Sequence, residues 1–218
     1  MKKTYQTVYA GGSAEIIEKK SRFIANVFPV ATEEEALEIL EKLRKKYWDA
    51  RHNCWAYVID AEHPVARCSD DGEPAQTAGK PMLDVLNGRE LYNVLVVVTR
   101  YFGGVLLGTG GLVRAYSKAV QEGLNQSTIV AKTLGVRLAI GTDYSGTGKI
   151  QYLLGKRGLK ALNTSYTDTV CTEVLVPEDD AERLKAEIRE ATAGKASMEE
   201  LGKCWFAEVD GRVEILGE

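Results

Sequence analysis

Residues 94–111, VLVVVTRYFGGVLLGTGG, decide how this chain folds. The first six are apolar at almost every consecutive position, which is typical of a strand buried on both faces in the middle of a sheet. Five of the nine residues from Gly103 to Gly111 are glycine, so the backbone there can adopt positive φ and approach a backbone or a ligand closely. Helical periodicity returns at Leu112. Strand, glycine turn and helix start therefore predict a point where bare N–H groups and the positive end of a helix dipole favour an anion.

The glycine turn matches neither common nucleotide-binding motif. A dinucleotide fingerprint needs G-x-G-x-x-G, and counted from Gly108 the sixth position is Val113. A P-loop needs a lysine after its second glycine. Gly103 and Gly108 have the required spacing, but Thr109 occupies the lysine position. Taken alone, the turn favours a tight strand-to-helix connection over a binding site.

Two flanking arginines favour a binding site at the turn. Arg100 ends the strand, and Arg114 lies near the beginning of the helix. A cation in the first turn opposes the helix dipole, so Arg114 is easier to explain if an anion or a carboxylate lies nearby. Both arginines are therefore candidate binding residues, together with the five glycines of the turn, Gly103, Gly104, Gly108, Gly110 and Gly111.

A second candidate region is the loop of residues 67–81. Its carboxylates Asp70, Asp71 and Glu73 would suit Mg²⁺, but their spacing fits no EF-hand, and we predict no metal site. Thr77 is a predicted N-cap of the next helix and is kept as a candidate. The length of the loop suggests that it folds onto the sheet. There the carboxylates would form ion pairs, structural or part of a site, with Arg51, Arg100 or Arg114.

The third candidate region is the start of the strand at residues 52–59. Strand alternation places His52 and Cys54 on one face and Arg51 and Asn53 on the other. A Cys–His nucleophilic pair is conceivable there, but Cys54 is as well explained as a small core residue. No Ser-His-Asp order, HExxH or G-x-S-x-G motif is present. We predict no catalytic residue and no cofactor, and keep Arg51 and His52 as binding candidates.

The remaining pattern predicts two α+β domains, residues 1–128 and 129–218, divided where the composition changes near residues 126–128. The first has strands over 5–18 (interrupted at Gly11-Gly12), 23–30, 52–59 and 94–99, with a long unstructured loop over 60–77. Helices are expected after Thr32, which forms a capping box with Glu35, and over residues 78–86. The second domain has the βαββαβ order of a ferredoxin-like unit over residues 134–140, 147–156, 160–167, 170–176, 179–191 and 204–209.

Composition indicates a soluble globular protein. It is 44% hydrophobic and 27% charged, and no segment approaches the roughly 20 apolar residues of a membrane span. Residues 1–6 are basic without an apolar stretch behind them, so we expect no secretion signal, no membrane partner and a cytoplasmic location. The cysteines are scattered without a CxxC motif, which favours reduced thiols over disulfides or zinc at Cys54, Cys68, Cys171 and Cys204.

The charge distribution argues against non-specific nucleic-acid binding. Residues 1–130 hold 16 basic and 16 acidic side chains, and residues 131–218 hold 12 and 15. Neither half has the basic excess that neutralises phosphates. The strand at 170–176 also lacks the aromatic side chains on which the main RNA-binding version of this fold stacks bases. An RNA role would therefore need a local patch, and the sheet of the second domain is better suited to packing or protein contact.

Four stretches, in order, resemble the bacterial YigZ branch of the IMPACT family: residues 20–25, 51–57, 69–74 with 77–81, and 98–104 with 107–116. The second half is similar to the small domain that follows in bacterial members, itself similar to the last domain of elongation factor G. One departure is Gln76, where the family pattern has glycine. The departure concerns the local shape of the loop and leaves the membership unaffected.

The resemblance implies a first domain with the fold of domain 2 of a small-subunit ribosomal protein, a mixed sheet with helices on one face. That fold also occurs in the catalytic domain of small-molecule kinases. The resemblance further implies a role near translation, because eukaryotic relatives regulate initiation by binding a partner of a stress kinase. A translation factor or the ribosome is the expected partner, and the sequence leaves the oligomeric state open.

Three hypotheses remain open at this stage. The first is a non-catalytic translation-associated protein that binds through an anion- or peptide-binding cleft of the first domain. The second is an enzyme acting on a phosphorylated small molecule or nucleotide, although the P-x-x-x-G-L-G-S-S type of loop found in the kinase relatives is absent. The third is a scaffold protein without a ligand.

Overall fold

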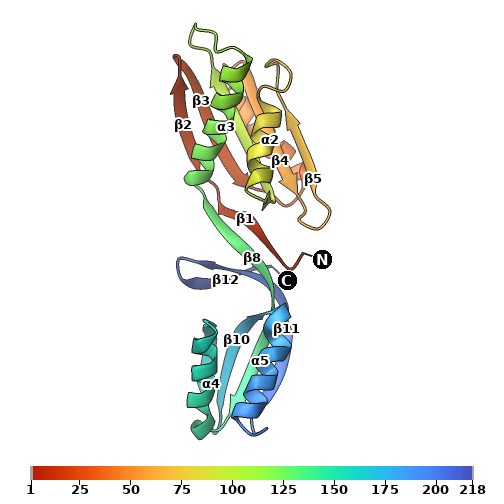
Figure 1. Ribbon diagram of the computed structural model, residues 1–218, viewed down its shortest axis with the longest axis vertical. Helices are drawn as coiled ribbons and strands as arrows, with labels where there is room; N and C mark the ends of the chain where they lie inside the picture. Colours follow the sequence, from red (N-terminus) through yellow and green to blue (C-terminus); the bar gives the residue numbers. More distant parts are fainter. Residues whose placement is uncertain (1, 218) are drawn as a thin grey trace. The chain divides into compact units, whose positions relative to one another are not determined.

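The computed structural model describes residues 2–217, and its contacts divide the chain into two units, Met1–Ala131 and Lys132–Glu218. Both units combine helices with a β-sheet, which is the α+β class predicted from the sequence (Figure 1). The domain boundary predicted after residue 128 falls at the start of strand β8 (Thr128–Thr142), so the composition change there marks the beginning of a strand.

A five-stranded sheet organises the first unit, and strand β7 (Val94–Tyr101) lies at its centre. Residues 94–100 of this strand are all buried, as its apolar run predicts. Every neighbouring pair in this sheet is antiparallel, so it is not the mixed sheet that we expected. Around β7 the order is β2 (Ser13–Glu18), β3 (Ser21–Pro29), β7, β4 (His52–Ile59) and β5 (Val65–Ser69).

Helices cover both faces of this sheet, whereas the sequence predicted helices on one face. Helices α2 (Gly79–Gly88) and α3 (Thr109–Asn125) pack on the face that carries Val96 and Val98 (Figure 1). Helix α1 (Glu33–Lys46) packs against Leu95 and Val97, which alternation directs to the opposite face. A strand apolar at consecutive positions needs such cover on both sides.

The N-cap predicted at Thr32 is confirmed, although Glu35 contacts the amide of Ala31 and not that of Thr32. The Thr32 side chain accepts a hydrogen bond from the Glu35 amide at 3.2 Å, and the Glu35 carboxylate accepts one from the Ala31 amide at 2.7 Å. The expected first strand is two strands, β1 (Thr4–Ala10) and β2, separated at the predicted glycines, and β1 pairs in parallel with the short β6 (Leu91–Tyr92).

The loop predicted over residues 60–77 contains a strand, β5, that the sequence did not reveal. Its first three residues are exposed at the sheet edge, so it has no alternation of buried and exposed side chains. Pairing with β4, from Val65 opposite Ile59 to Ser69 opposite Trp55, defines the strand instead.

The second unit has the predicted βαββαβ order in an antiparallel sheet. Helices α4 (Tyr144–Lys156) and α5 (Glu178–Ala191) lie on one face, over Leu138 and Val174 (Figure 1). The sequence did not predict two features of this unit. Strand β11 begins seven residues before the predicted start at Cys204, and a further strand, β12, pairs with it in a hairpin. The strand order is β12 (Arg212–Gly217), β11 (Ser197–Val209), β8, β10 (Val170–Pro177) and β9 (Ala161–Tyr166).

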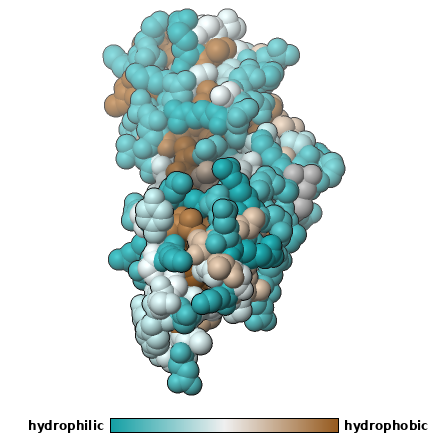
Figure 2. Space-filling view, turned by 60° about the horizontal axis from the view of Figure 1, so that its bottom comes forward, coloured by the Kyte–Doolittle hydropathy of each residue, from teal (hydrophilic) through white to brown (hydrophobic). Residues whose placement is uncertain are grey.

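The four cysteines are free thiols, and Cys54 and Cys204 are buried. Among residues 2–217 no helix is both long and apolar enough to cross a bilayer. Hydrophilic residues cover most of the face drawn in Figure 2, and apolar side chains there are confined to smaller patches between them.

Candidate functional site

A cavity of about 400 Å³ lies in the first unit where β7 ends and α3 begins. Five of the residues proposed from the sequence line it: Arg51, His52, Glu73, Arg100 and Gly108. The other lining residues are Pro74, Phe102, Leu106, Leu107, Thr109 and Leu112. The glycine turn, the acidic loop and the start of β4 therefore meet at one concave surface, although not every predicted residue contributes to it.

The floor of the cavity is a buried ion pair. Arg100 Nη1 lies 2.6 Å from Glu73 Oε1, and the two side chains are 7% and 3% exposed. The Tyr116 hydroxyl donates to the same carboxylate oxygen at 2.8 Å. Of the pairings expected between the acidic loop and the arginines, this is the one that forms, and it ties the loop to the central strand.

Two rings enclose the guanidinium of Arg100. Its carbon lies 5.3 Å from the centre of the Phe23 ring and 5.7 Å from that of Phe102, within the range of cation–π attraction. Its Nη2 is 3.4 Å from Ser21 Oγ, a long hydrogen bond. Its Nε is buried and has no hydrogen-bond partner among residues 2–217. Arg100 thus keeps one unsatisfied donor beside the cavity.

Helix α3 begins at the cavity without a protein cap. Gly108, at the N-cap, has φ 74°, a conformation that glycine adopts without strain, and offers no side chain to the amides. The first turn holds no acidic residue, and the amides of residues 109–111 have no partner within residues 2–217. Arg114 lies in the second turn of α3 and does not line the cavity, although its Nη1 lies 3.6 Å from where a Cβ on Gly110 would be.

Apolar side chains of Phe102, Leu106, Leu107 and Leu112 form a wall of the same cavity. Leu106 is 82% exposed and Phe102 is 48% exposed, while Leu112 is buried. This wall was not predicted from the sequence, because the prediction rested on the glycines of the turn and not on the leucines between them. The available signal was a run of large apolar residues, Val105, Leu106 and Leu107, inside a turn that no regular element shields.

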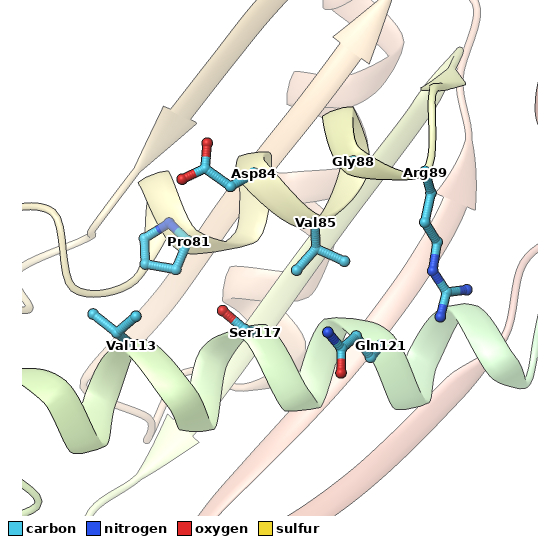
Figure 3. Close-up of a pocket in the computed structure, with 8 residues that line it drawn as sticks. All are labelled: Pro81, Asp84, Val85, Gly88, Arg89, Val113, Ser117 and Gln121. Atoms are coloured by element: carbon cyan, nitrogen blue, oxygen red, sulfur yellow. The ribbon is translucent and has the colours of Figure 1, made fainter.

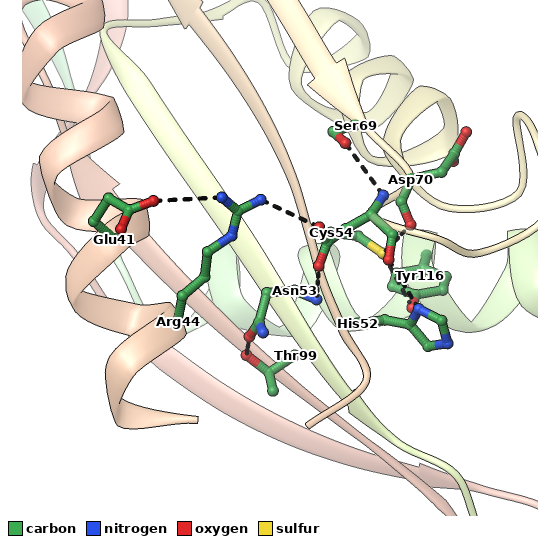
Figure 4. A network of polar contacts seen from close by, with 10 residues as sticks. Glu41, Arg44, His52, Asn53, Cys54, Ser69, Asp70, Thr99 and Tyr116 are labelled. Atoms are coloured by element: carbon green, nitrogen blue, oxygen red, sulfur yellow. Dashed lines mark hydrogen bonds and ion pairs between the residues drawn. The ribbon is translucent and has the colours of Figure 1, made fainter. Parts of the chain in front are cut away.

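Asp70 and Asp71 shape the acidic loop and do not pair with the predicted arginines. The Asp70 carboxylate accepts hydrogen bonds from the amides of Gln76, Ala78 and Gly79 at 2.8 to 2.9 Å, so it caps α2. The Asp71 carboxylate accepts from the Asn53 amide at 2.7 Å and from Arg44 at 3.2 Å; Figure 4 shows Arg44 extending from α1 toward this loop. Both carboxylates are therefore structural.

Thr77 is not the N-cap of α2 that the sequence predicted. The helix begins after Ala78 with no side-chain cap from its own N-cap residue. The Thr77 hydroxyl donates instead to the Pro74 carbonyl at 2.6 Å and is buried away from the cavity. The capping oxygen comes from Asp70, eight residues before Ala78, a partner that local spacing rules do not reveal.

The other glycines of the turn, Gly103, Gly104, Gly110 and Gly111, do not line the cavity, and three of them serve packing or conformation. A Cβ on Gly103 would lie 2.0 Å from the Lys20 carbonyl carbon, so the backbones pack too closely for any side chain. Gly104 has open space but φ 83°. A Cβ on Gly111 would lie 2.9 Å from Leu107 Cβ.

Cys54 and His52 do not form a nucleophilic pair. The Cys54 thiol donates to the Asp70 carbonyl at 2.9 Å and contacts the Tyr116 hydroxyl at 3.3 Å, while His52 Nδ1 lies 2.9 Å from the Asp71 carbonyl (Figure 4). Burial raises the pKa of the Cys54 thiol well above its usual range. The thiol therefore remains neutral near pH 7 and is not activated.

Comparison with known proteins shows the affiliation of both units. Residues 19–124 match the Impact N-terminal domain, and residues 140–195 match a domain of unknown function, DUF1949. The chain is 42% identical over 197 residues to the IMPACT family member YvyE of Bacillus subtilis (strain 168), covering 90% of this chain and 91% of that protein. It is 38% identical over 182 residues to the IMPACT family member YigZ of Escherichia coli (strain K12), covering 83% and 89%.

A solved structure supports the same relationship. A crystal structure described as that of a hypothetical protein is 34% identical and covers 93% of this chain and 99% of its own, with a TM-score of 0.60. The match in sequence over both units and the agreement in fold lead to one conclusion. This chain belongs to the IMPACT family.

Proposed function

We propose that this protein is a non-catalytic, cytoplasmic component of translational regulation that binds a translation factor or the ribosome through the cavity of its first unit. The observation that carries the proposal is the cavity itself. It combines polar groups, from Arg51, His52 and the uncapped start of α3, with an exposed apolar wall. Membership of the IMPACT family supports the translational setting, which is the setting that the resemblance implies.

The side chains beneath the cavity favour binding over catalysis. Nucleophilic catalysis needs a nucleophile and a base within hydrogen-bond reach. Here Cys54 and Tyr116 are neutral, since burial raises both pKa values, and Glu73 is held by Arg100 and Tyr116. His52 contacts a backbone carbonyl through Nδ1. These contacts tie the polar groups into the fold.

Charge favours a protein partner over RNA. The first unit carries no net basic excess, so phosphate neutralisation would contribute little to affinity. In the second unit an Arg137–Glu173 pair connects β8 and β10 in the middle of the sheet, where RNA-binding sheets of this type place aromatic side chains. RNA contact would have to come from a local patch.

One observation favours the second candidate function, an enzyme that acts on a phosphorylated small molecule or nucleotide. The three amides at the start of α3 are of the kind that bind phosphate at helix N-termini. Calorimetric titration with AMP, ATP and inorganic phosphate tests this alternative. A heat of binding that is measured with the wild-type protein and lost in the Arg51→Ala variant would favour it.

Sedimentation of the tagged full-length protein through a sucrose gradient tests the main proposal. We expect the protein to travel with ribosomal subunits or a co-purifying translation factor at low salt, and the Arg51→Ala variant to shift toward the top. Arg89→Ala is the matched control, because Arg89 lies in a separate groove between α2 and α3, beside Gln121 and away from the cavity (Figure 3). Wild-type protein that remains at the top at both low and high salt, with no translation factor bound, would contradict the proposal.

A further inference from the structure

The cavity lining combines two chemically different kinds of group. Polar groups come from Arg51, His52 and Thr109 at the start of α3, and apolar surface comes from Phe102 and Leu106. A ligand that fills it must therefore carry an anionic group beside an apolar one. A volume of about 400 Å³ is enough for one or two side chains with their backbone and excludes a folded domain.

The polar part of the lining has charge that the protein does not neutralise. Within residues 2–217 Arg51 forms no ion pair or hydrogen bond, and the amide of Thr109 is unpaired. Arg100, although paired through Nη1, leaves a buried Nε without a partner. This orphaned donor belongs to a side chain that lines the cavity, and it is independent of the uncapped helix.

The apolar side decides between kinds of anion. Its leucines and phenylalanine accept an aliphatic or aromatic side chain, whereas a nucleobase needs hydrogen-bonding groups along its edge. In the lining, all of it within residues 2–217, Glu73 and Arg100 are bonded to each other, which leaves Arg51, His52 and Thr109 as the side chains that could supply such groups. Exposure of Leu106 at 82% adds apolar surface that a partner would remove from water.

We infer that the cavity binds the free carboxyl terminus of a partner protein whose last side chain is apolar. The terminal carboxylate accepts a hydrogen bond from the Thr109 amide at the uncapped start of α3 and pairs with Arg51. The last side chain packs against Phe102 and Leu106. Capture of a terminal carboxylate by a row of backbone amides is an established mode of peptide recognition. The inference rests on the proposed function, because it specifies the part of the partner that the cavity holds.

The test uses the full-length protein and four fluorescein-labelled hexapeptides with a Gly-Ser spacer, ending in leucine, valine, isoleucine or phenylalanine. Each is prepared as the free acid and as the C-terminal amide, and binding is measured by fluorescence anisotropy. For at least one ending we expect the free acid to bind about tenfold or more tightly than its amide, because the amide lacks the charged carboxylate that accepts the hydrogen bonds. Replacing the last residue by glycine should weaken binding by a similar factor.

Variants locate the binding within the cavity. Arg51→Ala should weaken binding of the free acid but not of the amide, and Leu106→Ser should weaken both, because it removes apolar contact only. Both side chains are exposed, so the variants retain the fold, and circular dichroism verifies this. Arg89→Ala should leave binding unchanged, since Arg89 lines the other groove.

Three outcomes would overturn the inference. The first is equal affinity of acid and amide for all four endings, and the second is no binding with a dissociation constant below about 1 mM. The third is displacement of the peptide by inorganic phosphate or AMP at equal concentration, which would identify a phosphate site. Association with the ribosome or a translation factor that persists without peptide binding would reject this inference and leave the proposed function standing. Peptide binding without association with either would reject the proposed function and leave the peptide site standing.

Discussion

Arg100 at the end of β7 and Glu73 in the acidic loop form an ion pair that is almost fully buried, with Nη1 and Oε1 2.6 Å apart. The pair joins segments 27 residues apart in sequence and forms the floor of the cavity. Because the two charges compensate each other away from water, loss of either one would leave the other buried and unpaired.

Removing one partner of this pair should be severely destabilising. Glu73→Gln keeps the shape of the side chain but leaves the Arg100 charge buried without compensation, and we expect a loss of about 3 to 5 kcal/mol in the free energy of unfolding. Urea denaturation followed by circular dichroism measures it. Glu122→Gln is the matched control on α3, expected within about 0.5 kcal/mol of wild type because no buried pair is lost. Equal stability of the two variants would refute the structural role of the pair.

Gly103 should tolerate no side chain. A Cβ there would lie 2.0 Å from the Lys20 carbonyl carbon, and the amide of Gly103 donates to Ser21 Oγ at 3.2 Å. Gly103→Ala should cost about 1 to 3 kcal/mol or more by overpacking. Gly104→Ala, in open space at φ 83°, should cost only the left-handed backbone penalty of about 1 to 2 kcal/mol. Thermal denaturation compares them, and a Gly104 variant less stable than the Gly103 variant would contradict the packing argument.

Gln76 occupies a position suited to glycine. Its φ is 63°, in the left-handed region, and its amide is held by the Asp70 carboxylate at 2.8 Å. Gln76→Gly relieves backbone strain and should raise the free energy of unfolding by up to about 1 kcal/mol. Gln126→Gly is the matched control. Because φ at Gln126 is −91°, glycine there relieves no strain and only adds freedom to the unfolded chain, so it should lower the free energy of unfolding. The strain argument fails if both substitutions change the stability in the same direction by the same amount.

The buried Cys54 and Tyr116 should make the protein less stable in alkali. Burial raises both pKa values in the folded state, so the unfolded chain loses protons from these groups at lower pH than the folded protein does. Stability is therefore fully present below about pH 8.5, the ordinary value for a thiol, and falls as the pH rises above it. Urea denaturation between pH 7 and 10.5 measures the slope.

Tyr116→Phe removes one of the two titrating groups and should flatten the decline above about pH 10, the ordinary value for tyrosine. Tyr152→Phe is the control, since Tyr152 is exposed. An unchanged slope in the Tyr116 variant would show that the buried hydroxyl does not contribute to the alkaline loss.

Several features of this protein follow from the sequence alone because they depend on neighbours in the chain. The apolar run of β7 determines a strand buried on both faces, and the N-cap at Thr32 determines where α1 begins. The glycine-rich turn determines an uncapped helix start. The four short stretches named above, at residues 20–25, 51–57, 69–81 and 98–116, also identify the family, since its motifs are local.

Tertiary structure decided the features that depend on distant partners. Strand β5 exists because β4 pairs with it, and Asp70 caps α2 because the loop folds back on itself. The pairing of Arg100 with Glu73, and with neither Asp70 nor Asp71, follows from which carboxylate the folded loop directs into the core. Local propensity acts over a few residues, whereas burial and the pairing of charges act between surfaces that only the folded chain brings together.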